Sequence, residues 1–315
     1  MFSEKPDYFI GVDVSKLTLS ICVLHKNTIN HFEISNNKSD IIAFFAMYAN
    51  MRSYATFENT NTYNYDLMRA FDELGLAYAR LDAFKFSHFL KHNSKNKTDK
   101  SDAYAIALYG SKFYDELGKN EFSEEFALIK SYQSGLTQLN KISTQIQNFN
   151  EALANIDNQT LKEAMFEVLE TLKEQKKKVE DEVFELICSI VPQTKEIIKE
   201  NKGFGKSFAV YVLPLIYLNK ARSSNQLASY IGLAPMSYES GTSVKRGMHI
   251  SGGAKLARNC LFMCSLTASK YNEHFSAIYK RHIKNGKAKK VALCAVARKM
   301  LVFVKNIYFK DEIWK

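Results

Sequence analysis

Two long stretches in the middle of the chain repeat apolar residues at steps of three and four, and this repetition constrains the fold more than any other feature. The first stretch runs from about 122 to 156 and the second from about 161 to 190. So narrow an apolar stripe predicts two helices of about 30 residues each, paired as a hairpin or a coiled coil. The core of an ordinary helical bundle would show the same pattern, and Pro192 ends the second helix in both cases.

The residues before this helical pair alternate between strand-like and helix-like patterns. β-Branched and aromatic residues favour three strands, at 8–14, 17–24 and 28–34. The pattern then predicts helices at 39–50, 63–74 and 104–117, and strands at 54–57 and 76–81. Three strands followed by alternating helices and strands indicate a mixed sheet with helices packed on it.

The residues after the pair are expected to form helices joined by loops. The turn Gly203-Phe204-Gly205-Lys206 opens one of these helices. A turn of this kind can present backbone N–H groups to a phosphate, as in helix-hairpin-helix modules, although a plain helix–helix connection uses the same residues. We therefore expect an α/β plus α chain with an α/β domain at 1–118, a coiled-coil helical arm at 119–195 and a helical C-terminal domain at 196–315.

The positive charge of the chain is concentrated near its C-terminal end. The 315 residues include 43 Lys and Arg against 33 Asp and Glu, a net charge of +10. Residues 241–310 hold 15 of the basic residues and one acid, Glu273, so this segment alone carries +14. Such a segment is typical of a surface that neutralises phosphates. A solvated basic face is a weaker alternative, because solubility alone hardly explains a stretch so nearly free of acids. A membrane surface is also weaker, since no lipidation signal accompanies the charge.

Several features of the sequence bear on where the protein resides. No apolar run reaches the roughly 18 residues of a membrane span, and the first residues lack the pattern of a secretion signal. The five cysteines are scattered and contain no C-x-x-C pair, which indicates reduced thiols. We expect a soluble cytoplasmic protein without membrane contact, associated with the bacterial nucleoid.

Four acidic residues lie within or at the ends of two strands and one helix. Asp13 lies inside the first apolar strand, Glu58 ends a later one, and Asp99 and Asp102 lie at the start of a helix. The spacing of three places the last two carboxylates on one helical face. Four such acids could hold two Mg²⁺ ions for phosphodiester chemistry. Each also has a structural alternative: Asp99 and Asp102 as a helix cap, Glu58 as a solvated strand end.

The segments around these acids resemble those of a known family. Gly11-Val12-Asp13-Val14-Ser15-Lys16, the run from Glu58 to Tyr63 and Lys97-Thr98-Asp99-Lys100-Ser101-Asp102-Ala103 look like the DEDD-type insertion-sequence transposases. That family includes the Piv DNA invertases and the bridge-RNA-guided recombinases. Tyr238-Glu239-Ser240-Gly241 and Ile250-Ser251-Gly252-Gly253 with Arg258 resemble its second domain.

The resemblance implies a fold and a mechanism. It implies a RuvC-like (RNase H-type) domain that carries the tetrad Asp13, Glu58, Asp99 and Asp102 with Mg²⁺ or Mn²⁺. It also implies a coiled-coil arm for assembly and a C-terminal domain whose serine nucleophile matches Ser240. Ser243 and Ser251 are rivals for that role, although we interpret Ser251 as a helix N-cap. The implied site assembles between domains of a homo-oligomer, from dimer to tetramer.

The expected partners are target and donor DNA and, by the same resemblance, a structured non-coding guide RNA. The basic residues that we expect to contact nucleic acid are Lys97, Lys206, Lys245, Arg246, Lys255, Arg258, Lys287, Lys289, Lys290 and Arg298.

Four other functions remain open from the sequence. They are a Piv-like invertase acting on fixed sites, a RuvC-like junction-resolving nuclease, a DNA-binding architectural protein, and a tyrosine recombinase that would use Tyr271 or Tyr279. Cys260 and Cys264 could also bind a metal with His249, but their spacing of four is more typical of core thiols on one helix.

Overall fold

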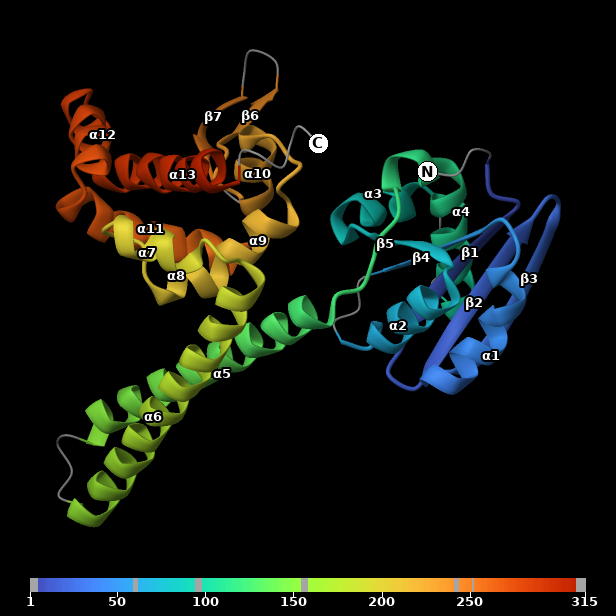
Figure 1. The fold of residues 1–315 in the computed structure, drawn as a ribbon, viewed down its shortest axis with the longest axis horizontal. Coiled ribbons are helices and arrows are strands. Elements are labelled where there is room, and N and C mark those ends of the chain that lie inside the picture. The colour runs from blue at the N-terminus through green and yellow to red at the C-terminus, as the bar shows by residue number, and fades with distance from the viewer. Residues whose placement is uncertain are drawn as a thin grey trace. The chain divides into compact units, whose positions relative to one another are not determined.

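The computed structural model describes residues 5–58, 62–93, 98–153, 158–240, 244–250 and 252–309. The chain divides into two compact units, Met1–Ser123 and Glu124–Lys315 (Figure 1). The first is an α/β unit and the second is helical apart from one hairpin. The expected three-part division, with its own boundary between arm and C-terminal domain, stays a prediction.

The N-terminal unit is built on a five-stranded mixed sheet, as the sequence predicts. The strand order is β3-β2-β1-β4-β5, with β1 antiparallel to β2 and parallel to β4. The strands are β1 (Tyr8–Val14), β2 (Thr18–His25), β3 (Thr28–Ser35), β4 (Ser53–Glu58) and β5 (Ala77–Leu81). All three N-terminal strands lie within one residue of their predicted bounds.

Helices cover both faces of this sheet because its central strand is apolar on both sides. Ile10, Val12 and Val14 pack under α1 (Lys38–Ala49) and α2 (Tyr65–Leu74). The alternate residues of β1 face α4 (Asp99–Leu117), which packs on the other side. A further helix that the sequence analysis missed, α3 (Ala83–Asn93), packs against α4.

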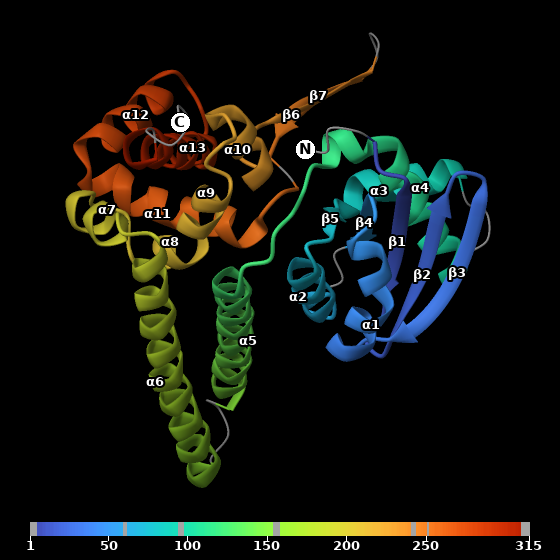
Figure 2. The same cartoon turned by 45° about the vertical axis from the view of Figure 1, so that its right-hand side comes forward.

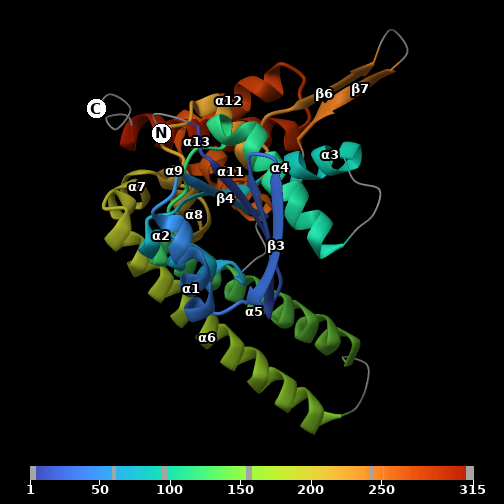
Figure 3. The ribbon, with the colours of Figure 1, turned by 90° about the vertical axis from the view of Figure 1, so that its right-hand side faces the viewer.

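Two long antiparallel helices form the arm of the second unit (Figure 3). They are α5 (Glu124–Ala152) and α6 (Gln159–Ile190), which confirms the predicted helical pair. Leu136, Val183 and Ile187 are fully buried at its base, together with Val210 of the following domain. The Tyr132 hydroxyl donates to Glu182 Oε1 at 2.5 Å and joins the two helices there.

The rest of the second unit is a helical body with one hairpin. Its helices are α7 (Thr194–Glu200), α8 (Lys206–Tyr211), α9 (Leu213–Leu218), α10 (Ser224–Ile231), α11 (Lys255–Tyr271), α12 (Glu273–Lys284) and α13 (Lys289–Tyr308). Phe208, Leu261 and Met300 are fully buried in its core. No helix in the described part of the chain is long and apolar enough to cross a membrane.

The prediction of an all-helical C-terminal region is wrong at one place. Strands β6 (Met236–Ser240) and β7 (Val244–His249) form an antiparallel hairpin that projects from the helices (Figure 2). The sequence does carry a signal for it, because Gly241 and two hydroxyl residues separate two short runs that contain β-formers.

Candidate active site

A glycine lets α4 lie directly on the central strand of the sheet. A Cβ placed on Gly11 would stand 2.2 Å from the carbonyl oxygen of Ala103 and 2.3 Å from the nitrogen of Ala107. Thr56 on the neighbouring strand donates from Oγ1 to the carbonyl oxygen of Ile106 at 3.0 Å. Asp102 directly precedes Ala103, and Asp99 lies one helical turn before it. The close contact therefore brings the N-terminal end of α4, with both acids, to the sheet.

The cap of α4 leaves both carboxylates available for another role. Thr98 is the N-cap, and its hydroxyl accepts from the Ser101 backbone N–H at 3.2 Å. The Ser101 hydroxyl in turn accepts from the Thr98 backbone N–H at 2.9 Å. The alternative that Asp99 caps the helix with help from Asp102 is therefore wrong. The helix dipole still favours acids in this first turn.

Asp13 and Glu58 lie at the same end of two neighbouring parallel strands. In the register of β1 and β4, Gly11 pairs with Thr56 and Val12 with Phe57. Asp13 comes directly after Val12, and Glu58 comes directly after Phe57. Because side chains alternate along a strand, both acids share the sheet face of Gly11 and Thr56, against which α4 packs.

The charges of the other three acids act on Asp13. The pKa of Asp13 is raised, first by partial burial and then by the negative charges of Asp102, Asp99 and Glu58, in that order. The Val14 backbone N–H opposes this shift. Like charges disfavour ionisation of a neighbour only over short distances. The four predicted residues, from two strands and one helix, therefore share one electrostatic environment.

The acids are near one another without forming a closed cage. Among the described residues, no three His, Cys, Asp or Glu side chains stand close enough to hold one metal ion. The donor set nevertheless fits Mg²⁺ or Mn²⁺, because these ions take carboxylate oxygens and keep several waters. A divalent cation would also offset the mutual repulsion that raises the pKa of Asp13.

Asn36 braces the loops next to two of the acids, a role that the sequence analysis missed. Its side-chain Nδ2 donates to the carbonyl oxygen of Ser15 at 2.8 Å and to that of Tyr63 at 2.9 Å. Ser15 lies two residues after Asp13, and Tyr63 lies five residues after Glu58. No sequence pattern could have indicated contacts over 21 and 27 residues of chain.

The candidate nucleophile belongs to the second unit. Ser240 is the last residue of β6 and pairs with Val244 across the hairpin. Ser243 and Ser251 lie outside the described residues. The N-cap of α11 is Ala254, so the interpretation of Ser251 as that cap is wrong.

A tight packing of glycines supports the start of the hairpin. Gly232 and Gly253 both have positive φ, and a Cβ on Gly253 would stand 2.6 Å from the Gly232 nitrogen. The Arg258 guanidinium donates to the carbonyl oxygens of Ile231 and Gly252. Arg258, expected to contact nucleic acid, thus holds together the segments that lead into and out of β6 and β7.

The other predicted basic residues lie in different surroundings. Lys255, Lys287, Lys289 and Lys290 are exposed. Arg298 donates to Asn225 Oδ1 at 3.0 Å, and Lys206 is paired with Asp181. Lys245 and Arg246 lie on β7, and Lys97 lies outside the described residues.

The pKa of one histidine reflects the positive charge of the basic segment. The pKa of His282 is lowered, first by burial and then by the charges of Lys287, Arg281 and Lys299. The cations of α12, α13 and their connection therefore create one positive region.

Comparison with known proteins places the chain in a family. A DEDD transposase model of the IS110 type matches residues 10–156, and a model described as "Transposase IS116/IS110/IS902 family" matches residues 195–280. The chain is 27% identical to the pilin gene-inverting protein of Moraxella lacunata and 26% identical to that of Moraxella bovis. Each alignment covers 93% of both sequences. The chain belongs to the DEDD-type IS116/IS110/IS902 family of transposases.

Proposed function

We propose that this member of the family cleaves and rejoins DNA with a serine nucleophile, Ser240, and a metal-binding tetrad, Asp13, Glu58, Asp99 and Asp102. The observation that carries the proposal is the convergence of the four acids from β1, β4 and the start of α4. The pKa of Asp13 agrees with it, since it is raised first by burial and then by the charges of the other three acids. A purely structural set of acids has no need of such mutual repulsion. The five-stranded mixed sheet further supports the proposal that the first unit is a RuvC-like domain.

The proposed reaction conserves the energy of the phosphodiester bond. The Ser240 hydroxyl loses its proton as its oxygen forms a bond to the scissile phosphorus. The bond from phosphorus to a deoxyribose oxygen breaks, and that oxygen takes up a proton. Attack by the hydroxyl of another strand on the phosphoserine then reverses these changes and releases the serine. Divalent ions held by Asp13, Glu58, Asp99 and Asp102 would neutralise charge at the phosphate and would favour ionisation of the attacking hydroxyl.

Other features fit a nucleic-acid enzyme with several partners. The exposed lysines of the basic segment would contact the phosphates of donor and target DNA and of a guide RNA. Four large apolar side chains on the arm support homo-oligomer assembly, because water contact with them is unfavourable. Their exposed fractions are 42% for Ile142, 47% for Phe149, 61% for Phe166 and 44% for Val168.

The decisive experiment is to trap a covalent protein–DNA adduct. Full-length protein is incubated with Mg²⁺, with DNA carrying the ends of its element, and with RNA transcribed from that element. We expect a detergent-stable adduct whose peptide contains phosphoserine at Ser240. Ser240→Ala and Asp13→Ala should abolish the adduct, whereas Ser243→Ala and Ser251→Ala should retain it. An adduct on another residue, or full adduct formation by Ser240→Ala, would contradict the proposal.

The two relatives favour one second candidate, an invertase. Both are named for inverting a pilin gene. A plasmid with two inverted recognition sites distinguishes the alternatives: an invertase reverses the intervening segment, and a transposase excises or inserts its element. If Ser240→Ala retained strand cleavage, a junction-resolving nuclease would be favoured instead. Normal recombination by Asp13→Ala would favour an architectural protein.

Dependence on a guide RNA has a separate test. RNase treatment of the protein before DNA is added should remove recombination if RNA chooses the site, and readdition of the element's transcript should restore it. An invertase that reads fixed sites by itself would keep its activity.

A further inference from the structure

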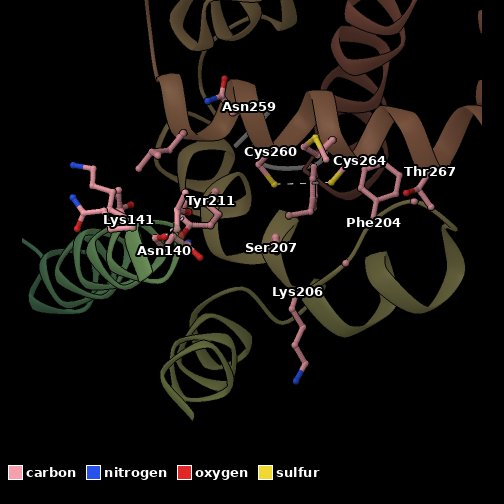
Figure 4. Close-up of a pocket in the computed structure, with 18 residues that line it drawn as sticks. Asn140, Lys141, Phe204, Lys206, Ser207, Tyr211, Asn259, Cys260, Cys264 and Thr267 are labelled. Carbon is pink, nitrogen blue, oxygen red and sulfur yellow. Dashed lines mark hydrogen bonds between the residues drawn. The ribbon is translucent and has the colours of Figure 1, made fainter. Parts of the chain in front are cut away.

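A cavity of about 990 Å³ lies within the second unit, between α5, α8 and α11 (Figure 4). Its apolar lining includes Phe204, Phe208 and Tyr211. Cys260 and Cys264 lie on α11, where their side chains point toward each other. They pack against the core, as the sequence analysis expected, but they also keep partial exposure toward this cavity.

Three sulfur atoms belong to this one stretch of helix. The Sγ atoms of Cys260 and Cys264 are 4.0 Å apart. Met263, which is 62% exposed, also lines the cavity. Met263 and Cys264 follow Cys260 by three and four residues, so each lies on the helical face next to Cys260. A thioether on a flexible side chain can therefore approach the two thiols.

A disulfide does not fit this geometry well. Disulfide-bonded cysteines have Cβ atoms about 3.8 Å apart. Residues four apart on a helix have Cβ atoms about 5–6 Å apart. Closing the bond would require α11 to distort where Leu261 and Ser265 are fully buried.

A bridging metal ion fits the same sulfurs without backbone movement. Metal–thiolate bonds of about 2.3 Å to two sulfurs span up to about 4.6 Å. The observed separation of 4.0 Å corresponds to a bent bridge within that reach. The cavity lining contains no Asp, Glu or His, and no group of three such residues or cysteines in the described part of the chain could hold a metal. A four-coordinate ion such as Zn²⁺ therefore lacks ligands here, whereas soft sulfur ligands select Cu(I).

We propose that Cys260, Cys264 and Met263 form a Cu(I) site. Binding replaces the thiol protons with the metal ion. The site is independent of the proposed recombination, since it uses no residue of the tetrad or the hairpin.

The test is a titration of reduced, full-length protein with Cu(I) under anaerobic conditions, in competition with a chromogenic Cu(I) chelator. We expect one ion bound per chain. Cys260→Ser and Cys264→Ser should each lose this binding, and Met263→Leu should weaken it by roughly tenfold or more. Cys188→Ser and Cys294→Ser are matched controls that should bind normally. Circular dichroism and melting temperature confirm that each variant is folded.

Alkylation of the unaltered protein gives a second readout that needs no variant. Bound Cu(I) should protect Cys260 and Cys264 from iodoacetamide and leave Cys188 and Cys294 reactive. Equal Cu(I) binding by the Cys260→Ser/Cys264→Ser double variant would overturn the proposal. Formation of a Cys260–Cys264 disulfide in place of Cu(I) uptake would overturn it too.

Discussion

At the scale of single residues, the candidate site depends on how closely a helix can approach a strand. Gly11 faces the backbone of α4 at Ala103 and Ala107. This contact also determines the position of two of the four acids, because Asp99 and Asp102 lie where α4 begins. The packing at Gly11 and the placement of two proposed metal ligands therefore depend on each other.

Gly11→Ala should disrupt both stability and activity. The added Cβ would overlap backbone atoms at 2.2 and 2.3 Å, so α4 must move away from the sheet. Overpacking of this kind costs about 1–3 kcal/mol in unfolding free energy. Denaturant unfolding measures the loss. Gly135→Ala on α5 is the control: nothing lies within 4 Å of its added Cβ, and it should stabilise by about 0.5–1 kcal/mol. A Gly11→Ala protein of unchanged stability would refute this account of the contact.

Asp13→Asn should raise the melting temperature of the metal-free protein at neutral pH. Folding raises the pKa of Asp13. The stability that protonated Asp13 contributes is therefore fully present below the unfolded pKa of about 3.9, and it is lost as the pH rises through the folded pKa. The amide removes the repulsion that remains at pH 7. Scanning fluorimetry with chelator and with Mg²⁺ tests this.

The same measurement separates charge from metal binding. Mg²⁺ should raise the melting temperature of the natural protein more than that of Asp13→Asn. Asp115→Asn, in the last turn of α4 and exposed, should keep the full response to Mg²⁺. An equal Mg²⁺ response in Asp13→Asn would argue against a metal site at this residue.

At the scale of elements, the arm has a buried base and an exposed outer part. Ile129, Leu136 and Ile187 are nearly or fully buried at the base, while Phe149 and Phe166 are 47% and 61% exposed farther along. The base is held by the body of its own unit, since Gln133 Nε2 donates to the Val210 carbonyl oxygen at 2.6 Å. The outer part is the surface on which we propose that another copy of the chain packs.

Two identical substitutions near the base of α5 test which face of the helix is buried there. Leu136→Ala should lower the unfolding free energy by about 2–5 kcal/mol, because it opens a cavity among fully buried residues. Leu128→Ala, on the same helix but 46% exposed, should change it by less than about 0.5 kcal/mol. Chemical denaturation of both proteins gives the comparison, and similar losses would mean that the helix packs differently.

Local sequence pattern explains which elements could be predicted. The strands β1 to β3 are rich in β-branched and aromatic residues, and the long helices repeat apolar residues over many turns. The hairpin β6–β7 is short and sits in a strongly basic segment, where charge hides the strand pattern. Helix α3 lies in a segment rich in Lys and His, and its packing on α4 outweighs that composition.

The candidate site could likewise be predicted only in part from the sequence. The four acids could be predicted from motifs and strand ends, but their mutual electrostatics depends on β1 pairing with β4 and on α4 folding back over both. The brace from Asn36 and the contact at Gly11 join residues distant in sequence. A glycine inside an apolar strand does signal close backbone approach, although it does not say to what.

At the scale of the whole molecule, charge is divided between the two units. The tetrad lies in Met1–Ser123, whereas the segment that carries +14 lies in Glu124–Lys315. The basic residues of this segment are not equivalent. Lys305 is only 3% exposed and its pKa is lowered by burial, while Lys287, Lys289 and Lys290 are exposed.

Lys290→Ala should weaken binding to DNA or RNA and make it less sensitive to salt. Each phosphate contact contributes about 0.9 to the slope of log affinity against log salt concentration, so the slope should fall by about 1. Fluorescence anisotropy at several salt concentrations measures it. Lys195→Ala removes the same charge from a lysine paired with Glu185 at 3.1 Å and should leave the slope unchanged. Equal effects of the two variants would indicate that net charge alone decides binding.

Two glycines at the contact between α4 and the sheet, Gly11 on β1 and Gly110 on α4, also predict which mutations can be rescued by a second mutation. A Cβ on Gly110 would collide with the side chain of Thr56, at 2.6 Å from Oγ1, and Thr56→Ala would remove that obstacle. A Cβ on Gly11 would collide with backbone atoms that every residue possesses. In a selection for restored recombination, Gly110→Ala should therefore yield suppressors at Thr56, whereas Gly11→Ala should yield only revertants.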